Sequence, residues 1–383
     1  MATIIDGDNK IPFMRGMLVQ YLIQRGIEHK QARDIANEVR QRLIKIEDIE
    51  KSEMLDLVRD VVNAFDIGDR VGDLQFWERQ ITQTVVEGEE GKGPFSKGLH
   101  ARLIERTGLA ADSAYSIAAA LEEQLVERRV EFISEEDLTS FTVELIAASH
   151  GHVYADRYRT WNTWWKKNRP IIILICGPSG AGKTTLAISL ANILNIPRVV
   201  ATDDIRQMMR LTLTTELMPT LHASTYNAWE FMPKGDEKES RVITGFRDQA
   251  RAICVGVEAI ISRCMSENTS VVVDGVHLLP DLLNISSHSD SALVIPLCIG
   301  LNDRKEYEKR FRRRSKQAPE RSMHRYLKYL DEIFIIQDHI LGTYFDAGYP
   351  VLHSTAFEDL KTDAVDCVCD ILLRHEKDFG AVE

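Results

Sequence analysis

The sequence predicts a mixed α/β protein whose sheet is mainly parallel, preceded by a helical region that ends near residue 153. Three observations support this fold class. The N-terminal part contains an internal repeat, apolar runs alternate with amphipathic stretches after Pro170, and a glycine-rich loop follows the first of those runs. An alternation of strands and helices is typical of a parallel sheet covered by helices.

Length and composition describe a globular protein with more than one domain. The chain has 383 residues, of which 44% are hydrophobic and 27% charged, and its formal net charge is −11. Such an acidic balance argues against nucleic acid as a partner. Ile171–Cys176 is the longest apolar run, too short to cross a membrane. Six cysteines without zinc-ligand spacing and the absence of a secretory pattern predict a cytoplasmic protein.

The internal repeat has an offset of 82 residues. Pro12–Leu43 aligns without a gap on Pro94–Leu125, and repeats of this kind indicate one structural unit used twice. The identical pairs are Pro12/Pro94, Phe13/Phe95, Gly16/Gly98, Gly26/Gly108, Ala32/Ala114, Ile35/Ile117, Ala36/Ala118 and Leu43/Leu125.

Each repeat is predicted to contain three helices. Apolar residues recur at helical spacing before and after Gly26, which suits a helix stop, and a serine with acidic residues opens the third helix of each unit. We place the two units at residues 1–70 and 71–153. Arg15 and Lys97 occupy equivalent positions and are the nearest phosphate ligands that the repeats offer. The units either bind nucleotide or serve only as helical packing.

A segment rich in tryptophan, residues 154–170, links the helical region to the rest of the chain. Trp161, Trp164 and Trp165 fall on one helical face. Packing between domains is the favoured interpretation, and stacking on an adenine ring is the alternative.

The remaining domain, residues 171–383, carries the predicted sheet. Amphipathic helices are expected between its strands, as in other α/β proteins. The predicted strands are Ile171–Cys176, Pro197–Ala201, Ser270–Asp274, Ala292–Ile299 and Pro350–Leu352.

The stretch GPSGAGKT matches the phosphate-binding loop (P-loop) pattern G-x-x-x-x-G-K-[ST], with a strand before it and a helix after it. Its glycines let backbone N–H groups converge on phosphate oxygens. Lys183 is expected to reach the β- and γ-phosphates of ATP and Thr184 to bind Mg²⁺. The residues predicted to bind the nucleotide are Gly177, Ser179, Gly180, Ala181, Gly182, Lys183, Thr184 and Thr185.

The second strand ends in ATDDIRQMMR, which predicts the acceptor side of a site. Asp203 or Asp204 could accept the proton of a hydroxyl group, and Asp203 is our candidate. A residue at this position could instead cap the following helix. Arg206 and Arg210 lie four residues apart and can bind an anionic substrate through bidentate contacts. A solvated helix face is the alternative for this pair.

The third predicted strand ends at Asp274, in the manner of a Walker B carboxylate that holds Mg²⁺ through water. His277 follows at the carboxyl edge of the sheet, where ligands bind in open α/β folds. It is therefore a candidate substrate ligand, although a lone histidine is as often structural.

An arginine-rich segment follows the fourth strand. Some of its arginines should stabilise the charge of a transferring phosphoryl group after closure of a lid, and a solvated charge run is the alternative. Arg310 and Arg313 are our candidate catalytic residues. The arginines of the segment are Arg304, Arg310, Arg312, Arg313 and Arg314.

These motifs together resemble the archaeal type of 2-phosphoglycerate kinase and its plant P-loop relatives. The resemblance covers essentially the whole chain, and GPSGAGKTT, ATDDIRQMMR, PTLHASTYNAWE, VVVDGVHLLP and RYLKYLDEIFIIQDHI carry it. It implies a P-loop kinase core, with ATP and Mg²⁺, that phosphorylates 2-phosphoglycerate to 2,3-bisphosphoglycerate. It also implies that the two N-terminal repeats are ATP-cone-like units.

Two positions depart from the pattern of that family. Asp274 stands where the family usually has Glu, and Phe334 or Ile335 stands where it usually has Arg. An inositol or inositol phosphate acceptor stays open, as does a nucleotide-gated regulatory protein with little turnover. The expected partner is a small phosphorylated acceptor, with neither nucleic acid nor membrane, and a homo-oligomer is possible.

Overall fold

The computed structural model describes residues 3–379 apart from internal gaps, and its described residues form two compact units. The units are Met1–Gln83 with Arg129–Glu131, and Thr84–Arg128 with Phe132–Glu383. We describe each unit by itself. The gaps are residues 7–8, 14, 25–26, 45, 47, 66, 68–83, 89–90, 129, 233–237, 286–290, 302, 318–322 and 354–355.

The first unit is a small α/β module. Its elements are β1 (Thr3–Asp6), β2 (Asn9–Pro12), α1 (Arg15–Gln24), α2 (His29–Arg42), β3 (Asp48–Glu50) and α3 (Lys51–Ala64). The sheet has the order β2-β1-β3, with β1 antiparallel to β2 and parallel to β3. Buried residues of all three helices, among them Leu18, Ile35 and Val58, share one core with Ile4 of β1.

The second repeat has the same order of elements. They are β4 (Val85–Gly88), β5 (Gly91–Pro94), α5 (Lys97–Glu105), α6 (Ala111–Glu127), β6 (Phe132–Ser134) and α7 (Glu135–His150). Its sheet, β5-β4-β6, has the pairings of the first. The offset of 82 holds from β1 to the start of α2, and it becomes 84 at the third strand because α6 is longer than α2.

The sequence therefore predicted the helices of each repeat but missed a strand hairpin and a third strand. The shift in offset also changes one assignment. Ser134 is the N-cap of α7, where its Oγ accepts the N–H of Asp137 at 3.0 Å. Its equivalent in the first repeat is Glu50, and Ser52 lies inside the first turn of α3.

Helix α8 (His152–Lys166) joins the second repeat to the core of the same unit. Trp161 and Trp164 are buried among residues of the central sheet and of α16 (Phe357–Phe379), and the Trp161 indole lies 3.4 Å from Cys369 Sγ. Tyr158 of the same helix is buried in the core of the second repeat. The tryptophans thus pack between layers, as the favoured interpretation expected.

A five-stranded parallel sheet forms the centre of the second unit, which confirms the predicted α/β class. Its order is β11-β10-β7-β9-β8, and every pairing is parallel. Each predicted strand is present within one residue of its expected ends. The strands are β7 (Ile171–Cys176), β8 (Arg198–Ala201), β9 (Val271–Gly275), β10 (Leu293–Gly300) and β11 (Val351–His353).

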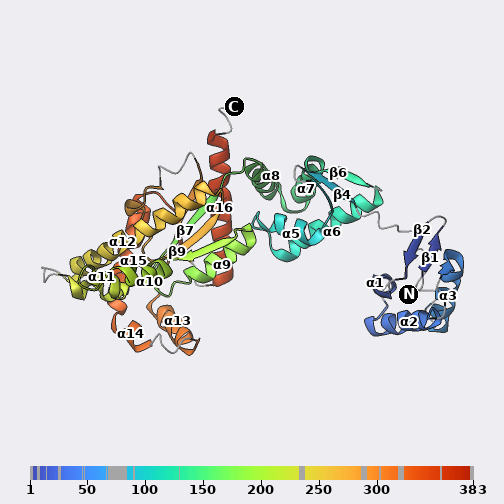
Figure 1. Ribbon diagram of the computed structural model, residues 1–383, viewed down its shortest axis with the longest axis horizontal. Coiled ribbons are helices and arrows are strands. Elements are labelled where there is room, and N and C mark those ends of the chain that lie inside the picture. The colour runs from blue at the N-terminus through green and yellow to red at the C-terminus, as the bar shows by residue number, and fades with distance from the viewer. Residues whose placement is uncertain are drawn as a thin grey trace. The chain divides into compact units, whose positions relative to one another are not determined.

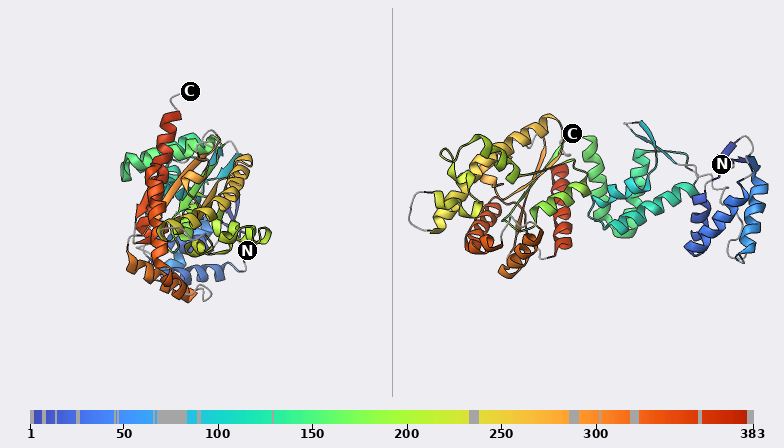
Figure 2. Two further views of the ribbon diagram at one scale, coloured as in Figure 1. Left: turned by 90° about the vertical axis from the view of Figure 1, so that its left-hand side faces the viewer. Right: turned by 60° about the horizontal axis from the view of Figure 1, so that its bottom comes forward.

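Helices cover both faces of this sheet (Figures 1 and 2). Alternate residues of β7 divide between two cores, as the period of two in a strand requires. Ile172 and Leu174 pack with α12 (Lys238–Ser266) and α15 (Leu330–Asp346), whereas Ile171 and Ile173 pack with the helices of the other face. Those helices are α8, α9 (Lys183–Leu194) and α16.

The remaining helices follow the carboxyl ends of the strands. They are α10 (Thr202–Thr212), α11 (Pro219–His222), the 3-10 helices η1 (Thr225–Phe231) and η2 (Pro280–Leu282), α13 (Arg304–Gln317) and α14 (Met323–Lys328). Helix α10 begins at Thr202 with Ala201 as N-cap, so neither Thr202 nor Asp203 caps it through a side chain. In the described part of the chain, no helix combines the length and apolar character needed to cross a membrane.

Candidate functional site

The loop between β7 and α9 takes a backbone conformation that depends on glycine. Gly177, Gly180 and Gly182 have φ angles of 146°, 89° and 99°, a region that other residues rarely adopt. A Cβ atom on Gly177 would also lie 2.5 Å from the carbonyl oxygen of Ile299. Lys183 opens α9 and donates from Nζ to the carbonyl of Pro178 at 2.8 Å, so its ammonium group lies over the loop.

A cavity of about 330 Å³ opens at the carboxyl ends of β7, β8 and β9. This is the edge where open α/β sheets bind ligands. The residues that line the cavity are Ser179, Gly180, Gly182, Lys183, Thr184, Thr185, Ala201, Thr202, Asp203, Arg206, Ser224, Thr225, Tyr226, Asp274, Gly275, Val276, Arg310 and Tyr326. Gly177 and Ala181, both predicted to bind the nucleotide, are not in this lining.

Thr184 and Asp274 meet at the floor of the cavity. Thr184 Oγ1 donates to Asp274 Oδ2 at 2.7 Å, and Asp274 Oδ1 is buried and has no hydrogen-bond partner within the described part of the chain. Burial raises the pKa of Asp274, while Thr184 and Lys183 act in the opposite direction. A buried carboxylate oxygen with an unused lone pair beside a hydroxyl fits Mg²⁺, which takes few protein ligands and completes its shell with water and phosphate oxygens.

The acceptor side of the cavity contains a carboxylate and a guanidinium group. Asp203 is largely exposed and accepts from Arg206 Nη2 at 3.1 Å, while the Arg206 side chain is only 15% exposed. Both residues line the cavity, whereas the exposed Asp204 does not. The structure thus distinguishes two adjacent acids that the sequence could not.

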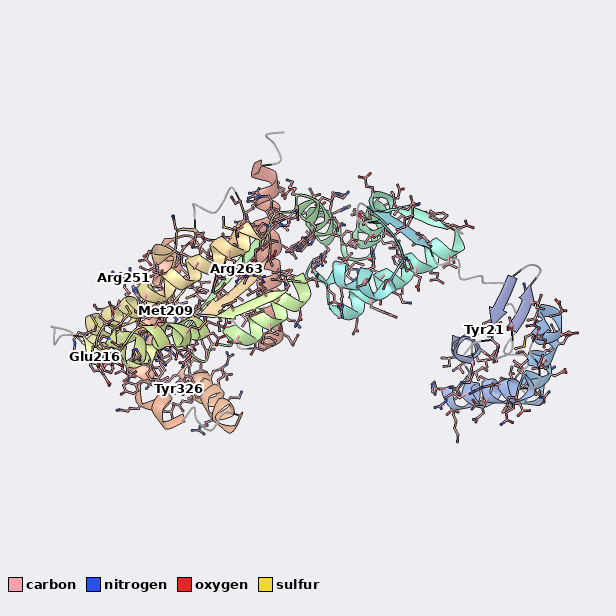
Figure 3. All side chains as sticks on the ribbon, viewed as in Figure 1. Tyr21, Met209, Glu216, Arg251, Arg263 and Tyr326 are labelled. Atoms are coloured by element: carbon pink, nitrogen blue, oxygen red, sulfur yellow. The ribbon has the colours of Figure 1, made fainter. Side chains whose placement is uncertain are left out.

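Helices α13 and α14 bring two more side chains to the cavity. Arg310 donates from Nη1 to the carbonyl of Ala181 at 2.9 Å and pairs with Glu306 at 3.2 Å. Tyr326 of α14, labelled in Figure 3, stacks on Phe311 with ring centroids 4.5 Å apart. The side chain of Arg313, our second candidate among the arginines, lies outside the described residues.

Two predicted substrate ligands do not line the cavity. Arg210 donates to the carbonyl oxygens of Leu221 and Ala223 at 2.8 and 3.0 Å, so it holds the backbone that follows α10. His277 is fully buried. We expected both residues to contact substrate. The structure instead places them outside the cavity lining, where they contact the residues that surround it.

His277 is held as a neutral imidazole by its surroundings. Burial, reinforced by Arg206, lowers its pKa to about 3. Thr202 Oγ1 lies 2.8 Å from Nδ1, and Gln249 Oε1 lies 3.0 Å from Nε2. A hydroxyl proton from Thr202 to Nδ1 and an Nε2 proton to Gln249 satisfy this arrangement.

Sequence reasoning missed the cavity residues supplied by η1 and α14. Ser224, Thr225, Tyr226 and Tyr326 line the cavity, yet none of them belongs to a spaced motif of charged residues. The available signals were the stretches PTLHASTYNAWE and RYLKYLDEIFIIQDHI, which contain these residues and carry the family resemblance. In addition, Ser224 is followed three residues later by Asn227, with which it forms a capping box.

The parallel sheet and the cavity at its carboxyl edge define an α/β protein with a candidate ligand site where open sheets of this kind bind ligands. No protein-family model matches the chain. Curated relatives do: 2-phosphoglycerate kinase of Pyrococcus furiosus is 34% identical over 265 residues, covering 69% of this chain and 86% of its own length. Those of Pyrococcus horikoshii and Methanocaldococcus jannaschii are each 32% identical, covering 73% and 75% of this chain and 91% and 92% of their own lengths.

The chain belongs to the 2-phosphoglycerate kinase family, as these relatives show. Their names support a kinase function for the chain and therefore the use of a nucleotide.

Proposed function

We propose that this protein transfers the γ-phosphoryl group of ATP to the hydroxyl group of 2-phosphoglycerate and forms 2,3-bisphosphoglycerate. One observation carries the proposal. A single cavity joins the glycine-rich loop with Lys183, the Thr184–Asp274 pair and the Asp203–Arg206 pair. Phosphoryl transfer needs a phosphate cradle, a metal site and an acceptor site within one enclosed space.

The loop and Lys183 account for binding of the ATP phosphates. The lysine needs only to exchange the Pro178 carbonyl for a phosphate oxygen, a charge-assisted and therefore stronger contact. Thr184 and Asp274 would hold Mg²⁺, which neutralises charge on the transferring group. Arg310 already donates to the carbonyl of Ala181 in the loop, and its guanidinium group would help to neutralise the negative charge of the transferring phosphoryl group.

Asp203 is our proposed general base. Its exposed carboxylate can accept the acceptor's hydroxyl proton, and its contact with Arg206 orients it. Arg206 would bind the anionic part of the acceptor.

The departure from the family pattern at Phe334 lies away from the cavity. The Phe334 ring packs on the ring of Tyr307 with centroids 5.2 Å apart, in the core beneath α13. This position therefore gives no support to a different acceptor, and the cavity residues themselves support an anionic one.

The test is an acceptor screen followed by ³¹P NMR. Purified protein with Mg²⁺ and ATP should convert 2-phosphoglycerate to a species with two phosphomonoester signals, together with release of ADP. Turnover of an inositol or an inositol phosphate instead would overturn the acceptor and retain the kinase. ATP binding without turnover of any acceptor would favour a regulatory protein.

A further inference from the structure

One backbone carbonyl on the acceptor side of the cavity collects three donors. Arg206 Nη1, Arg210 Nη2 and Gln249 Nε2 lie 3.4, 3.0 and 3.2 Å from the carbonyl oxygen of Ala223. Gln249 is fully buried and accepts from Thr225 Oγ1 at 3.1 Å. So many fixed contacts on adjacent residues make the segment from Ala223 to Thr225 a rigid wall of the cavity.

Ser224 stands in the middle of this wall and lines the cavity. The two residues face each other as in a capping box: the Asn227 N–H donates to the Ser224 carbonyl at 3.0 Å, and the Ser224 N–H donates to Asn227 Oδ1 at 2.9 Å. A serine hydroxyl can donate one hydrogen bond, so Ser224 can donate its proton to an anion in the cavity. The contacts of the described residues include no acceptor for that proton.

Arg206 lies beside Ser224 because it is held by the preceding carbonyl. Its Nη2 donates to Asp203, while its Nε is buried and has no partner among the described residues. An unpaired buried donor lowers stability by about 1–3 kcal/mol. An oxygen of a bound anion would provide an acceptor for this side chain and for the Ser224 hydroxyl together.

We propose that Ser224 determines specificity for an anionic acceptor, and that its hydroxyl and the Arg206 guanidinium form the subsite for the acceptor's phosphate or carboxylate oxygen. This inference rests on the proposed function, since it assumes an acceptor that carries such a group. The contacts with Asn227 hold the backbone of Ser224, and the Gln249–Thr225 contact holds the next residue, so the serine keeps its place in the cavity wall.

Three substitutions of Ser224 separate the donor from the cap. Ser224→Asp keeps an oxygen that caps η1 but removes the donor and adds a negative charge. Ser224→Thr keeps both the cap and the donor, whereas Ser224→Ala removes both. Ser149→Asp, on the exposed end of α7, is the matched control for the change of charge.

Binding is measured by calorimetry with 2-phosphoglycerate, inorganic phosphate and D-glycerate, each in the presence of saturating ATP analogue. We expect a Kd for 2-phosphoglycerate raised about 10-fold by Ser224→Ala and about 100-fold by Ser224→Asp, since a hydrogen bond to a charged group contributes about 1.5–3 kcal/mol. Ser224→Thr and Ser149→Asp should stay within about 3-fold of wild type. Nucleotide affinity and the unfolding midpoint of Ser224→Asp should match wild type.

Inorganic phosphate and D-glycerate each carry only one of the two anionic groups of 2-phosphoglycerate, so they show which group the subsite binds. Weakened binding of inorganic phosphate in Ser224→Asp assigns the subsite to the phosphate, and weakened binding of D-glycerate assigns it to the carboxylate. Arg206→Ala combined with Ser224→Ala should weaken binding by less than the product of the single effects, because both groups contact one anion.

Failure of this inference is distinct from failure of the proposed function. If wild type binds 2-phosphoglycerate but does not phosphorylate it, the proposed reaction fails. The subsite is then still tested by comparing the Kd of 2-phosphoglycerate for wild type and for Ser224→Asp. If Ser224→Asp binds all three probes as wild type does, the inference is overturned. It is equally overturned if wild type binds none of them, or if Ser224→Asp weakens the nucleotide as much as the acceptor.

Discussion

At the scale of single residues, the function of a side chain follows from whether it faces the cavity or the core. Lys183 and Arg210 are both basic residues on helices that follow strands, yet only Lys183 lines the cavity. Arg210 donates hydrogen bonds to two backbone carbonyl groups instead. Spacing in the sequence identifies the residue types, and only the packing of α10 shows which of them are available to a ligand.

Lys183→Ala should abolish phosphoryl transfer and leave the fold intact. The lysine lies over the glycine-rich loop, and its removal leaves the phosphates without their mobile cation. Steady-state ADP release and the unfolding midpoint are the two measurements. Lys309→Ala, which removes a charge at an 80% exposed side chain of α13, is the control. Turnover close to wild type in folded Lys183→Ala would contradict the kinase proposal.

Asp203→Asn should lower kcat by about 10²–10⁴-fold, the usual contribution of a general base, with a smaller effect on the KM for ATP. Asp204→Asn is a matched control because the neighbouring acid is exposed and outside the cavity. Both variants are measured with 2-phosphoglycerate at saturating ATP. A silent Asp203→Asn beside a damaging Asp204→Asn would show that we have chosen the wrong acid.

Asp274→Asn should stabilise the metal-free protein while it reduces the stabilisation by Mg²⁺-nucleotide. Burial raises the pKa of Asp274 above its ordinary value of 3.8, so the folded state binds this proton more tightly than the unfolded state does. Stability from this group is therefore lost as pH rises from 3.8 through the folded pKa, and the loss persists at neutral pH. Asparagine carries no charge and can still accept from Thr184.

The measurement for Asp274→Asn is the unfolding midpoint at pH 7 with and without Mg²⁺. We expect a higher midpoint than wild type without metal, and a stabilisation by Mg²⁺-nucleotide that is present in wild type and reduced in the variant. A lower midpoint in metal-free Asp274→Asn, with an unchanged response to Mg²⁺, would contradict the metal site.

Residue-level prediction from the sequence was therefore uneven for physical reasons. The glycine-rich loop could be located because its backbone geometry restricts which residues fit. The buried position of His277 could not, because a histidine at a strand exit reads the same whether it faces a ligand or Gln249. Ser224 and Tyr326 lie in stretches that carry the family resemblance, but their positions in the site were missed because the type of residue does not show which hydroxyl groups the fold brings to a cavity.

At the scale of elements, long buried strands were predictable and short edge strands were not. The run IIILIC of β7 is buried along its whole length and reads as a strand by composition alone. The hairpin strands of the repeats are four residues each, and β5 has the sequence GKGP, which has no strand propensity. These strands pair because of their packing within the folded repeat, and the local sequence does not show that packing.

Arg157 leads to a testable prediction at the scale of elements, because it contacts α16 and the turn between α5 and α6 from its place on α8. This α8 residue is 7% exposed, pairs with Asp366 and Asp370 of α16, and donates to the Thr107 carbonyl in the turn between α5 and α6. Burial lowers the pKa of Arg157, but the neighbouring Cys369 and the hydrogen bonds to Asp366 and Asp370 outweigh it and raise this pKa. Through these contacts Arg157 connects the second repeat to α16, the helix that packs on the central sheet.

Arg157→Ala should lower the free energy of unfolding by about 1–3 kcal/mol, since it removes buried donors from partners that are partly exposed. Hydrogen exchange should accelerate at the α5–α6 turn more than in β7. Arg159→Ala removes an exposed pair with Asp156 on the same helix and should change neither quantity. Equal acceleration throughout the unit would show a general loss of stability rather than a local attachment.

At the scale of the whole molecule, the two repeats share a fold but differ in how they are used. The first belongs to a separate compact unit, while the second packs with the core. Their equivalent basic residues differ as well. Arg15 donates to the neutral amide of Asn37, whereas Lys97 is paired with the carboxylate of Glu122. The hydrogen-bond partner of Arg15 in the first repeat therefore carries no charge, whereas the partner of Lys97 in the second repeat is a carboxylate.

We therefore expect removal of residues 1–83 to leave catalysis intact and to abolish any response of kcat to excess ATP or dATP. This prediction treats the repeats as ATP-cone-like regulatory units, as the sequence suggested. A truncated protein that begins at residue 154 should instead lose stability, because Tyr158 is buried against the second repeat and Arg157 would lose the Thr107 carbonyl. Kinetics at millimolar nucleotide and unfolding midpoints of both truncations are the measurements.

Calorimetry on residues 1–83 then decides between regulation and packing. Heat of ATP binding that is lost in Arg15→Ala would support a nucleotide site in the first repeat, because Arg15 is the basic group expected to contact phosphate. Lys97→Ala in the full chain is the comparison, and we expect a smaller effect because Glu122 already neutralises that lysine. No heat of binding at millimolar ATP, together with unaltered kinetics after removal of residues 1–83, would leave the repeats a packing role alone.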